Sequence, residues 1–173
     1  MFLDAFKRKS IKRSLERVLD SPPEQEGSGR IRSIGFLVDA RQFNDIDRLW
    51  EMARKIKGDD RYCKVCCYVQ DIPEMMQMRA ISFDDDVIGW KGQLKDTELE
   101  EFTAEPFDLL VNFFTQEDLS LIYIAGTSRA KFKAGFPLQT YPLNDLVIDT
   151  PLQKLETFET ELIKYLKILK RIA

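Results

Sequence analysis

The feature that most constrains the fold is the regular alternation of short, almost wholly apolar segments with longer amphipathic ones. The clearest apolar segment is FDLLVNFF at residues 107–114, and a second, IRSIGFLVD, covers residues 31–39. Consecutive apolar side chains indicate strands covered on both faces, which is typical of parallel sheets. Strands that alternate with helices predict βαβ units, and hence a mainly parallel sheet with helices on both faces.

Capping signals place the ends of several predicted helices. Asn44 is expected to cap a helix that Gly58 ends. Thr97 is expected to begin a short helix over residues 97–104, and Thr150, followed by Pro151, to begin the last helix. A further helix is predicted at residues 118–126, and further strands are predicted at residues 62–69, 80–83, 131–135 and 146–149.

The length of 173 residues fits one domain with a sizeable core. We predict three parts: a basic helix over residues 1–20, a flexible linker over residues 21–29, and an α/β body over residues 30–173. The body is expected to be a single three-layer Rossmann-like domain. Ile11 and Leu15 lie on one apolar stripe of the first helix, which predicts that the helix packs against the body or a partner.

Charge is unevenly distributed along the chain. The first twenty residues hold six basic and three acidic side chains, whereas the whole chain has a net charge of −3. A basic helix on an acidic body is expected to bind its own body, a second copy or an anionic surface. The sequence pI near 5.2 argues against nucleic acid as a partner. Attachment to a membrane through residues 1–19 is a weaker alternative, because Phe2, Leu3 and Phe6 lie apart from the main apolar stripe.

Composition excludes several kinds of chemistry. The chain has no histidine, so it contains neither a Ser-His-Asp nor a Cys-His nucleophile and no imidazole ligand for a metal. Its cysteines, Cys63, Cys66 and Cys67, lie on a predicted strand that turns Cys66 away from the other two, so we interpret them as small buried residues. We therefore expect no metal and no cofactor.

Nucleotide and membrane signals are also missing. The turn after the first strand, residues 39–44, has no glycine, and the chain has no G-x-x-x-x-G-K-[ST] loop, which argues against NAD and P-loop chemistry. No apolar run approaches the roughly 20 residues of a membrane span, and residues 1–6 do not resemble a signal peptide. These features predict a cytoplasmic protein.

Polar side chains follow several predicted strands, and in such folds ligands bind at the carboxyl ends of the strands. Acidic residues gathered there can hold Mg²⁺, but Asp is also a common turn and capping residue, which is the interpretation that we favour. The residues placed at this edge are Asp39, Arg41, Asp71, Asp84, Asp85, Asp86, Asn112, Thr115 and Gln116.

Two other segments carry possible binding residues. Trp90 stands between Gly89 and Gly92 in an acidic loop, where it is either a ligand lid, a contact anchor or an apolar plug over the sheet. Lys131 to Phe136 alternates basic and aromatic residues, which is weak support for a nucleic-acid strand on an acidic body. As ligand contacts we select Asp39, Arg41, Asp84, Trp90 and Asn112.

The order and spacing of four segments resemble one family. The segments FDLLVNFF at 107–114, SRAKFKAGF at 128–136, NDLVID at 144–149 and ELIKYLKILK at 161–170 are similar to an uncharacterised family of small Bacteroidetes proteins, over roughly residues 30–171. This domain of unknown function implies no activity, cofactor or site residue. Residues 107–112, 121–125 and 133–136 are also similar to the N-terminal domain of heptosyltransferase-like glycosyltransferases, which implies a Rossmann-like order of layers.

Three functions remain open at this point. The preferred one is a non-enzymatic cytoplasmic module that binds an acidic partner or a second copy through its basic helix. The second is a small-molecule binder or enzyme that uses the carboxyl-end edge of the sheet for a nucleotide, nucleotide-sugar or phosphate. The third is a peripheral membrane protein.

Overall fold

The computed structural model describes residues 2–21, 29–59, 62–70 and 79–173. Its centre is a six-stranded sheet in the order β3-β2-β1-β4-β5-β6, in which every neighbouring pair is parallel. The predicted α/β class and Rossmann-like single domain are thus confirmed. The strands are β1 (Ile34–Asp39), β2 (Cys63–Tyr68), β3 (Ile81–Phe83), β4 (Leu109–Phe113), β5 (Lys133–Gly135) and β6 (Leu146–Val147).

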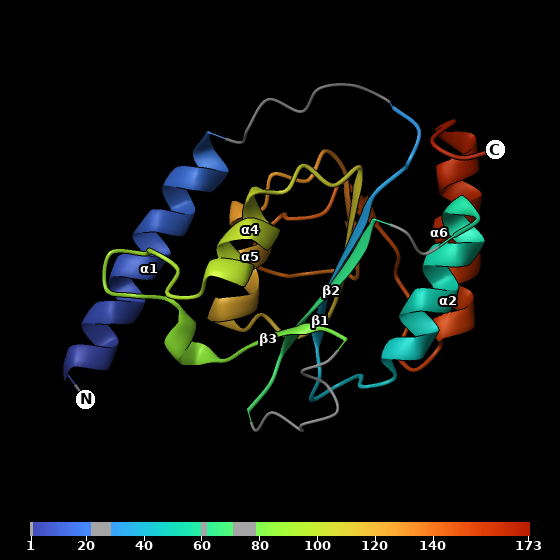
Figure 1. Ribbon diagram of the computed structural model, residues 1–173. Helices are drawn as coiled ribbons and strands as arrows, with labels where there is room; N and C mark the ends of the chain where they lie inside the picture. Colours follow the sequence, from blue (N-terminus) through green and yellow to red (C-terminus); the bar gives the residue numbers. More distant parts are fainter. Residues whose placement is uncertain (1, 22–28, 60–61, 71–78) are drawn as a thin grey trace.

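Helices cover both faces of this sheet (Figure 1). On one face lie α2 (Ile46–Lys57) and α6 (Leu155–Ile168), and on the other lie α4 (Thr97–Ala104) and α5 (Leu119–Thr127). The helix α1 (Phe2–Asp20) lies outside α5, farther from the sheet. The architecture is therefore three layers with an additional helix on one side.

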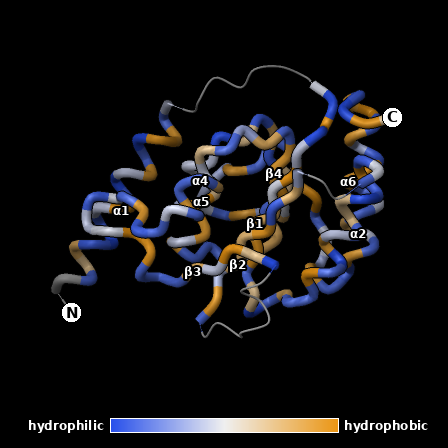
Figure 2. The backbone as a smooth tube through the Cα atoms, in the orientation of Figure 1, coloured by the Kyte–Doolittle hydropathy of each residue, from blue (hydrophilic) through white to orange (hydrophobic). Residues whose placement is uncertain are grey.

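The two central strands are buried along their whole length. Every residue of β1 and of β4 is buried, as the apolar runs predict. Figure 2 shows the strands as mainly hydrophobic segments between helices of mixed character. Successive side chains of each strand point to opposite faces of the sheet and so belong to two separate hydrophobic clusters, one under α2 and α6 and one under α4 and α5.

Several predicted helix starts are wrong by a few residues. Asp45, not Asn44, caps α2 by accepting a hydrogen bond from Arg48 N at 3.4 Å. Asp96, one residue before Thr97, caps α4. The last helix begins at Leu155, because residues 150–153 form a turn before it. Gly58 does end α2, with a φ of 89°.

Helix α5 is buried on all sides. Seven of its nine residues, Ser120 to Gly126, are buried, so this helix needs cover on the side away from the sheet. Leu15 of α1, which has no exposed surface, provides that cover at Gly126. A methyl group added at Gly126 would lie 2.7 Å from Leu15 Cδ1, so the glycine sets the close approach of the two helices. The basic helix thus packs on its own body.

The loop between β3 and α4 runs along the flank of α1 (Figure 1). It starts with the short helix η1 (Asp85–Val87), where Asp86 lies 4.0 Å from Lys7. Farther on, a side chain added at Gly92 would contact Ser14 within 3.0 Å. Val87 and Ile88 are the loop's buried apolar residues, whereas Trp90 is 46% exposed. The apolar plug of this loop is therefore formed by residues other than Trp90.

Candidate functional site

The carboxyl end of β1 holds a tight ion pair. Asp39 is completely buried, and its carboxylate accepts hydrogen bonds from Arg41 Nε at 2.8 Å and from Arg41 Nη2 at 2.9 Å. The backbone N–H of Arg41 also donates to this carboxylate, at 3.0 Å. Such a bidentate pair satisfies both charges within the fold. Asp39 and Arg41, which the sequence analysis selected as ligand contacts at this edge, are neighbours in the structure, and each is the other's binding partner.

Arg41 is in turn held by its surroundings. Its Nη2 lies 3.4 Å from Asp118, the capping residue of α5, and its guanidinium lies 4.4 Å from the centre of the Tyr68 ring. The hydrogen bond from Arg41 to Asp39 raises the pKa of the guanidinium above its ordinary value. Burial, together with the charges of Asp118 and Asp85, raises the pKa of the Tyr68 hydroxyl. Arg41 is therefore a permanent cation and Tyr68 a neutral phenol.

The order of the strands reverses between β1 and β4. Such a reversal is called the switch point of the sheet, and nucleotides bind there in open α/β sheets. Here the protein's own side chains span that point. The Gln42 Oε1 atom accepts hydrogen bonds from Thr115 N and Thr115 Oγ1, both at 3.1 Å. This link joins the loop after β1 to the loop after β4. The crevice at the switch point is consequently bridged.

The other predicted contacts serve local structure. Asp84 accepts a hydrogen bond from Asp86 N at 2.9 Å and so caps η1. Asp85 accepts one from Ser120 Oγ at 2.8 Å. Asn112 donates to Asn144 Oδ1 at 2.8 Å, and its own buried Oδ1 has no partner among the described residues. Asp71 lies outside the described residues, as does most of the predicted linker.

A crevice separates α1 from the carboxyl edge of the sheet. One hollow of about 450 Å³ is lined by Arg8 and Lys12 on one side and by Glu117 and Tyr141 on the other. Burial by itself would raise the pKa of Glu117, but hydrogen bonds from the loop at Thr140 hold that pKa below its ordinary value. The sequence did not indicate this crevice, because it forms between residues more than 100 positions apart.

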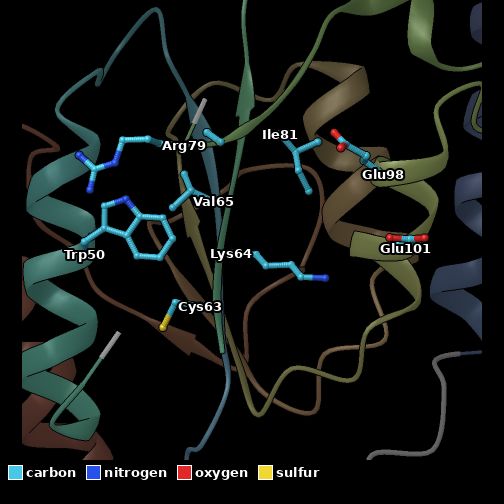
Figure 3. Close-up of a pocket in the computed structure, with 9 residues that line it drawn as sticks. Trp50, Cys63, Lys64, Val65, Arg79, Ile81, Glu98 and Glu101 are labelled. Carbon is cyan, nitrogen blue, oxygen red and sulfur yellow. The ribbon is translucent and has the colours of Figure 1, made fainter. Parts of the chain in front are cut away.

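A second surface hollow, which we call the edge groove, lies beside β2 (Figure 3). It has a volume of about 380 Å³ and is lined by Trp50, Cys63, Lys64, Val65, Arg79, Ala80, Ile81, Glu98 and Glu101. The groove exists because β3 pairs only with residues 66–68 of β2, so the sheet is one strand narrower before that point. Figure 3 shows Trp50 on one side of β2 and the two glutamates of α4 on the other.

The two cations that line the edge groove, Lys64 and Arg79, are both paired with acidic residues beside it. Lys64 lies 2.5 Å from Glu105, and Arg79 forms an ion pair with Asp47. The buried Trp50 Nε1 has no hydrogen-bond partner among the described residues. The sequence analysis missed this groove, because helix and strand periodicity alone do not reveal how far β3 extends along β2.

Cys66 and Cys67 are buried, as the sequence analysis expected, whereas Cys63 is half-buried. Cys66 lies in the cluster under α4 and α5, whereas Cys67 lies in the opposite one, as the strand alternation predicts. Burial raises the pKa of both thiols, to about 12 for Cys67. Lys133 is 8% exposed and donates to Ala125 O at 2.7 Å. Within the described ranges, no three Cys, Asp or Glu side chains are arranged to hold a metal ion.

A family model described as "Family of unknown function (DUF6913)" matches residues 7–169. The chain belongs to this family. The match confirms the resemblance to a family without an assigned activity, and it extends the predicted coverage to include most of α1. No match was found among curated proteins. The DUF6913 match does not address the likeness to heptosyltransferase-like enzymes or a Bacteroidetes source. In the part of the chain that the structure describes, no helix is long and apolar enough to cross a membrane.

Proposed function

We propose that this DUF6913 protein is a non-enzymatic binding module of the cytoplasm, which captures an acidic protein surface on the outward face of α1. The observation that carries the proposal is a row of cations that form no ion pair within the described part of the chain. Lys7 lies near Asp86, but the other basic side chains of α1 form no ion pair with any described residue: Arg8, Lys9, Lys12, Arg13 and Arg17.

The packing of α1 supports a binding role for its outer face. The inner stripe, with Ile11 and Leu15, is buried against the body, so the helix is already ordered before any partner arrives. A preformed surface loses less conformational entropy on binding than a flexible arm does. Lys9, Arg13 and Arg17 point away from this stripe at 100° per residue and are exposed. They are the side chains that a partner would meet first.

The carboxyl edge supports the non-enzymatic part of the proposal. Asp39 is saturated by Arg41, Asp84 is used as a cap, and the switch point is bridged by Gln42. A general acid or base must be within hydrogen-bond reach of the proton that it moves, so carboxylates occupied in this way are poorly placed for catalysis.

The test compares partner capture by two full-length variants. In the first, Lys9, Arg13 and Arg17 are replaced by Glu. In the matched control, three exposed cations elsewhere, Arg129, Lys154 and Lys167, are replaced by Glu, which changes the net charge equally. After quantitative co-purification from the natural source, the α1 variant is expected to lose its protein partners and the control to keep them. Equal recovery of partners by both variants would refute the proposal.

A second candidate is a small molecule in the crevice beneath α1. It is favoured by two adjoining hollows, of about 450 and 320 Å³, that share Arg8 and Leu119. A ligand at 100 times its Kd adds about 2.7 kcal/mol to the stability of the folded state. Thermal-shift screening with Mg²⁺, nucleotides and nucleotide-sugars should then reveal a stabiliser, and Arg8→Ala should abolish its effect. The absence of any stabiliser in this screen removes the candidate.

Peripheral attachment to a membrane is distinguished by flotation. Phe6 is 69% exposed and lies on the outward side of α1, near the basic side chains. Vesicles with 30% anionic lipid, used at low salt, should carry the protein upward in a density gradient if α1 binds lipid. Protein that stays at the bottom excludes the membrane as the anionic partner.

A further inference from the structure

We infer that the acidic surface captured by α1 belongs to a second copy of this chain, in which the edge groove beside α4 receives it. This inference rests on the proposed function and specifies its partner. The groove is the hollow between Trp50 and the glutamates of α4 that Figure 3 shows.

Charge complementarity is the first argument for this pairing. Helix α4 is acidic on its exposed side, where Glu98, Glu100 and Glu101 form no ion pair with any described residue. The outward face of α1 carries the opposite charge on Lys9 and Arg13. Complementary charges of this kind speed association and fix the register of two surfaces.

The spacing of side chains on α1 is the second argument. Phe6, Lys9 and Arg13 stand at positions i, i+3 and i+7, so they share one face of the helix, as the anchors of a helix bound in a groove do. At a rise of about 1.5 Å per residue, Lys9 lies roughly 4.5 Å and Arg13 roughly 10.5 Å from Phe6 along the helix. Phe6 is 69% exposed, so its ring is accessible to a partner on the same face as the two cations.

The edge groove offers matching chemistry. Trp50 and Val65 line the groove on one side of β2, and Ile81 lines it on the side of the glutamates, so apolar surface for a phenyl ring is present on both sides. The groove volume of about 380 Å³ exceeds that of one phenylalanine side chain. Glu98 and Glu101 stand one helical turn apart on α4, at the side of the groove. Lys9 and Arg13 are the next basic residues along the face of α1 that carries Phe6, so with Phe6 in the hollow we expect them to be the cations that meet these two carboxylates.

Each copy carries both surfaces, and the two do not overlap. The inner stripe of α1 remains on its own α5, so no exchange of helices between copies is required. A contact between unlike surfaces either closes reciprocally in a dimer or continues from copy to copy. In both cases the average mass rises with protein concentration and falls as salt screens the charges.

The experiment is sedimentation velocity of the full chain over a hundredfold range of concentration at low salt. The α1 variant, Lys9→Glu with Arg13→Glu, and the α4 variant, Glu98→Lys with Glu101→Lys, are each expected to weaken self-association at least tenfold. Mixing the two variants should restore association, because the reversed charges complement each other between chains. A chain with all four substitutions should also self-associate. Phe6→Ala should weaken association without a change of charge.

Controls separate this inference from the function on which it rests. Asp149→Lys with Glu156→Lys makes the same charge change as the α4 variant at exposed positions away from the groove, and it should leave association intact. A wild-type chain that stays monomeric throughout, or a mixture of variants that fails to associate, overturns the inference. If, in co-purification, the α1 variant loses partner proteins other than this chain while the α4 variant keeps them, the proposed function stands and only the identity of the partner is wrong.

Discussion

The contact between Leu15 and Gly126 gives the sharpest test of how α1 is attached. Leu15 has no exposed surface, so Leu15→Ala removes a fully buried side chain and leaves a cavity between the two helices. Substitutions of this kind cost about 2–5 kcal/mol of unfolding free energy. Because α5 has apolar residues on all sides, the neighbouring part of the helix cannot turn a polar face into the gap. We expect a loss near the middle of that range.

Gly126→Ala probes the same contact from the other side. The added methyl group would lie 2.7 Å from Leu15 Cδ1, so Leu15 must move. Overpacking of this kind costs about 1–3 kcal/mol, and the better helix propensity of alanine returns about 1 kcal/mol. In the double variant, the alanine methyl fills part of the cavity left by Leu15→Ala. The combined loss should therefore be about 1–2 kcal/mol smaller than the sum of the single losses.

Urea denaturation of the full chain, followed by far-UV circular dichroism, measures all four proteins of this cycle. Arg13→Ala serves as a control for a change on α1 that does not touch α5, and it should shift the unfolding free energy by less than about 0.5 kcal/mol. Losses that add to within about 0.5 kcal/mol would mean that Leu15 and Gly126 do not touch. A negligible effect of Leu15→Ala would mean that α1 does not cover α5 in solution.

Substitutions at three further sites test charged groups that are held by hydrogen bonds within the fold. Asp108→Asn should cost about 1–3 kcal/mol, because the carboxylate accepts bonds from two backbone N–H groups, a hydroxyl and a lysine. Those bonds lower its pKa despite burial, so the stability from Asp108 is complete above its ordinary pKa of 3.8 and is lost in acid denaturation below it. Burial lowers the pKa of Lys133 from 10.5 to about 8, so the unfolding free energy of the wild type should rise between pH 8 and pH 10.5. Lys133→Met should remove this rise, and it should increase the unfolding free energy at pH 7 by about 1 kcal/mol. Arg41→Ala should cost about 3 kcal/mol or more by leaving the Asp39 carboxylate buried alone, and adding Asp39→Asn should recover part of that loss in thermal unfolding.

The fold was largely readable from the sequence, because burial on both faces of a parallel strand leaves an unmistakable apolar run. Residues 107–114 and 31–39 both became central strands. The ends of helices were less readable. Asn44 and Asp45 are both capable caps, as are Asp96 and Thr97, and the choice between neighbours depends on backbone angles that a sequence pattern does not contain.

The site was readable only in part. The sequence placed Asp39 and Arg41 at the carboxyl edge, where they are found, but it did not show that they pair with each other. The interpretation of the acidic residues as turn and cap residues describes Asp84 correctly. The edge groove and the crevice beneath α1 were missed, since each is formed by segments distant in the chain whose contact no local pattern encodes.

The position of α1 also bears on the order in which the chain is made and folds. Leu15 emerges from the ribosome 111 residues before Gly126, its contact on α5. Until α5 has been made, the basic helix lacks the apolar helix that it covers in the folded chain. The contact is among the longest-range ones in the fold, and such contacts close late because a large loop must be ordered first. The apolar stripe of α1 is therefore a segment of the nascent chain that stays without its native cover until α5 has been made.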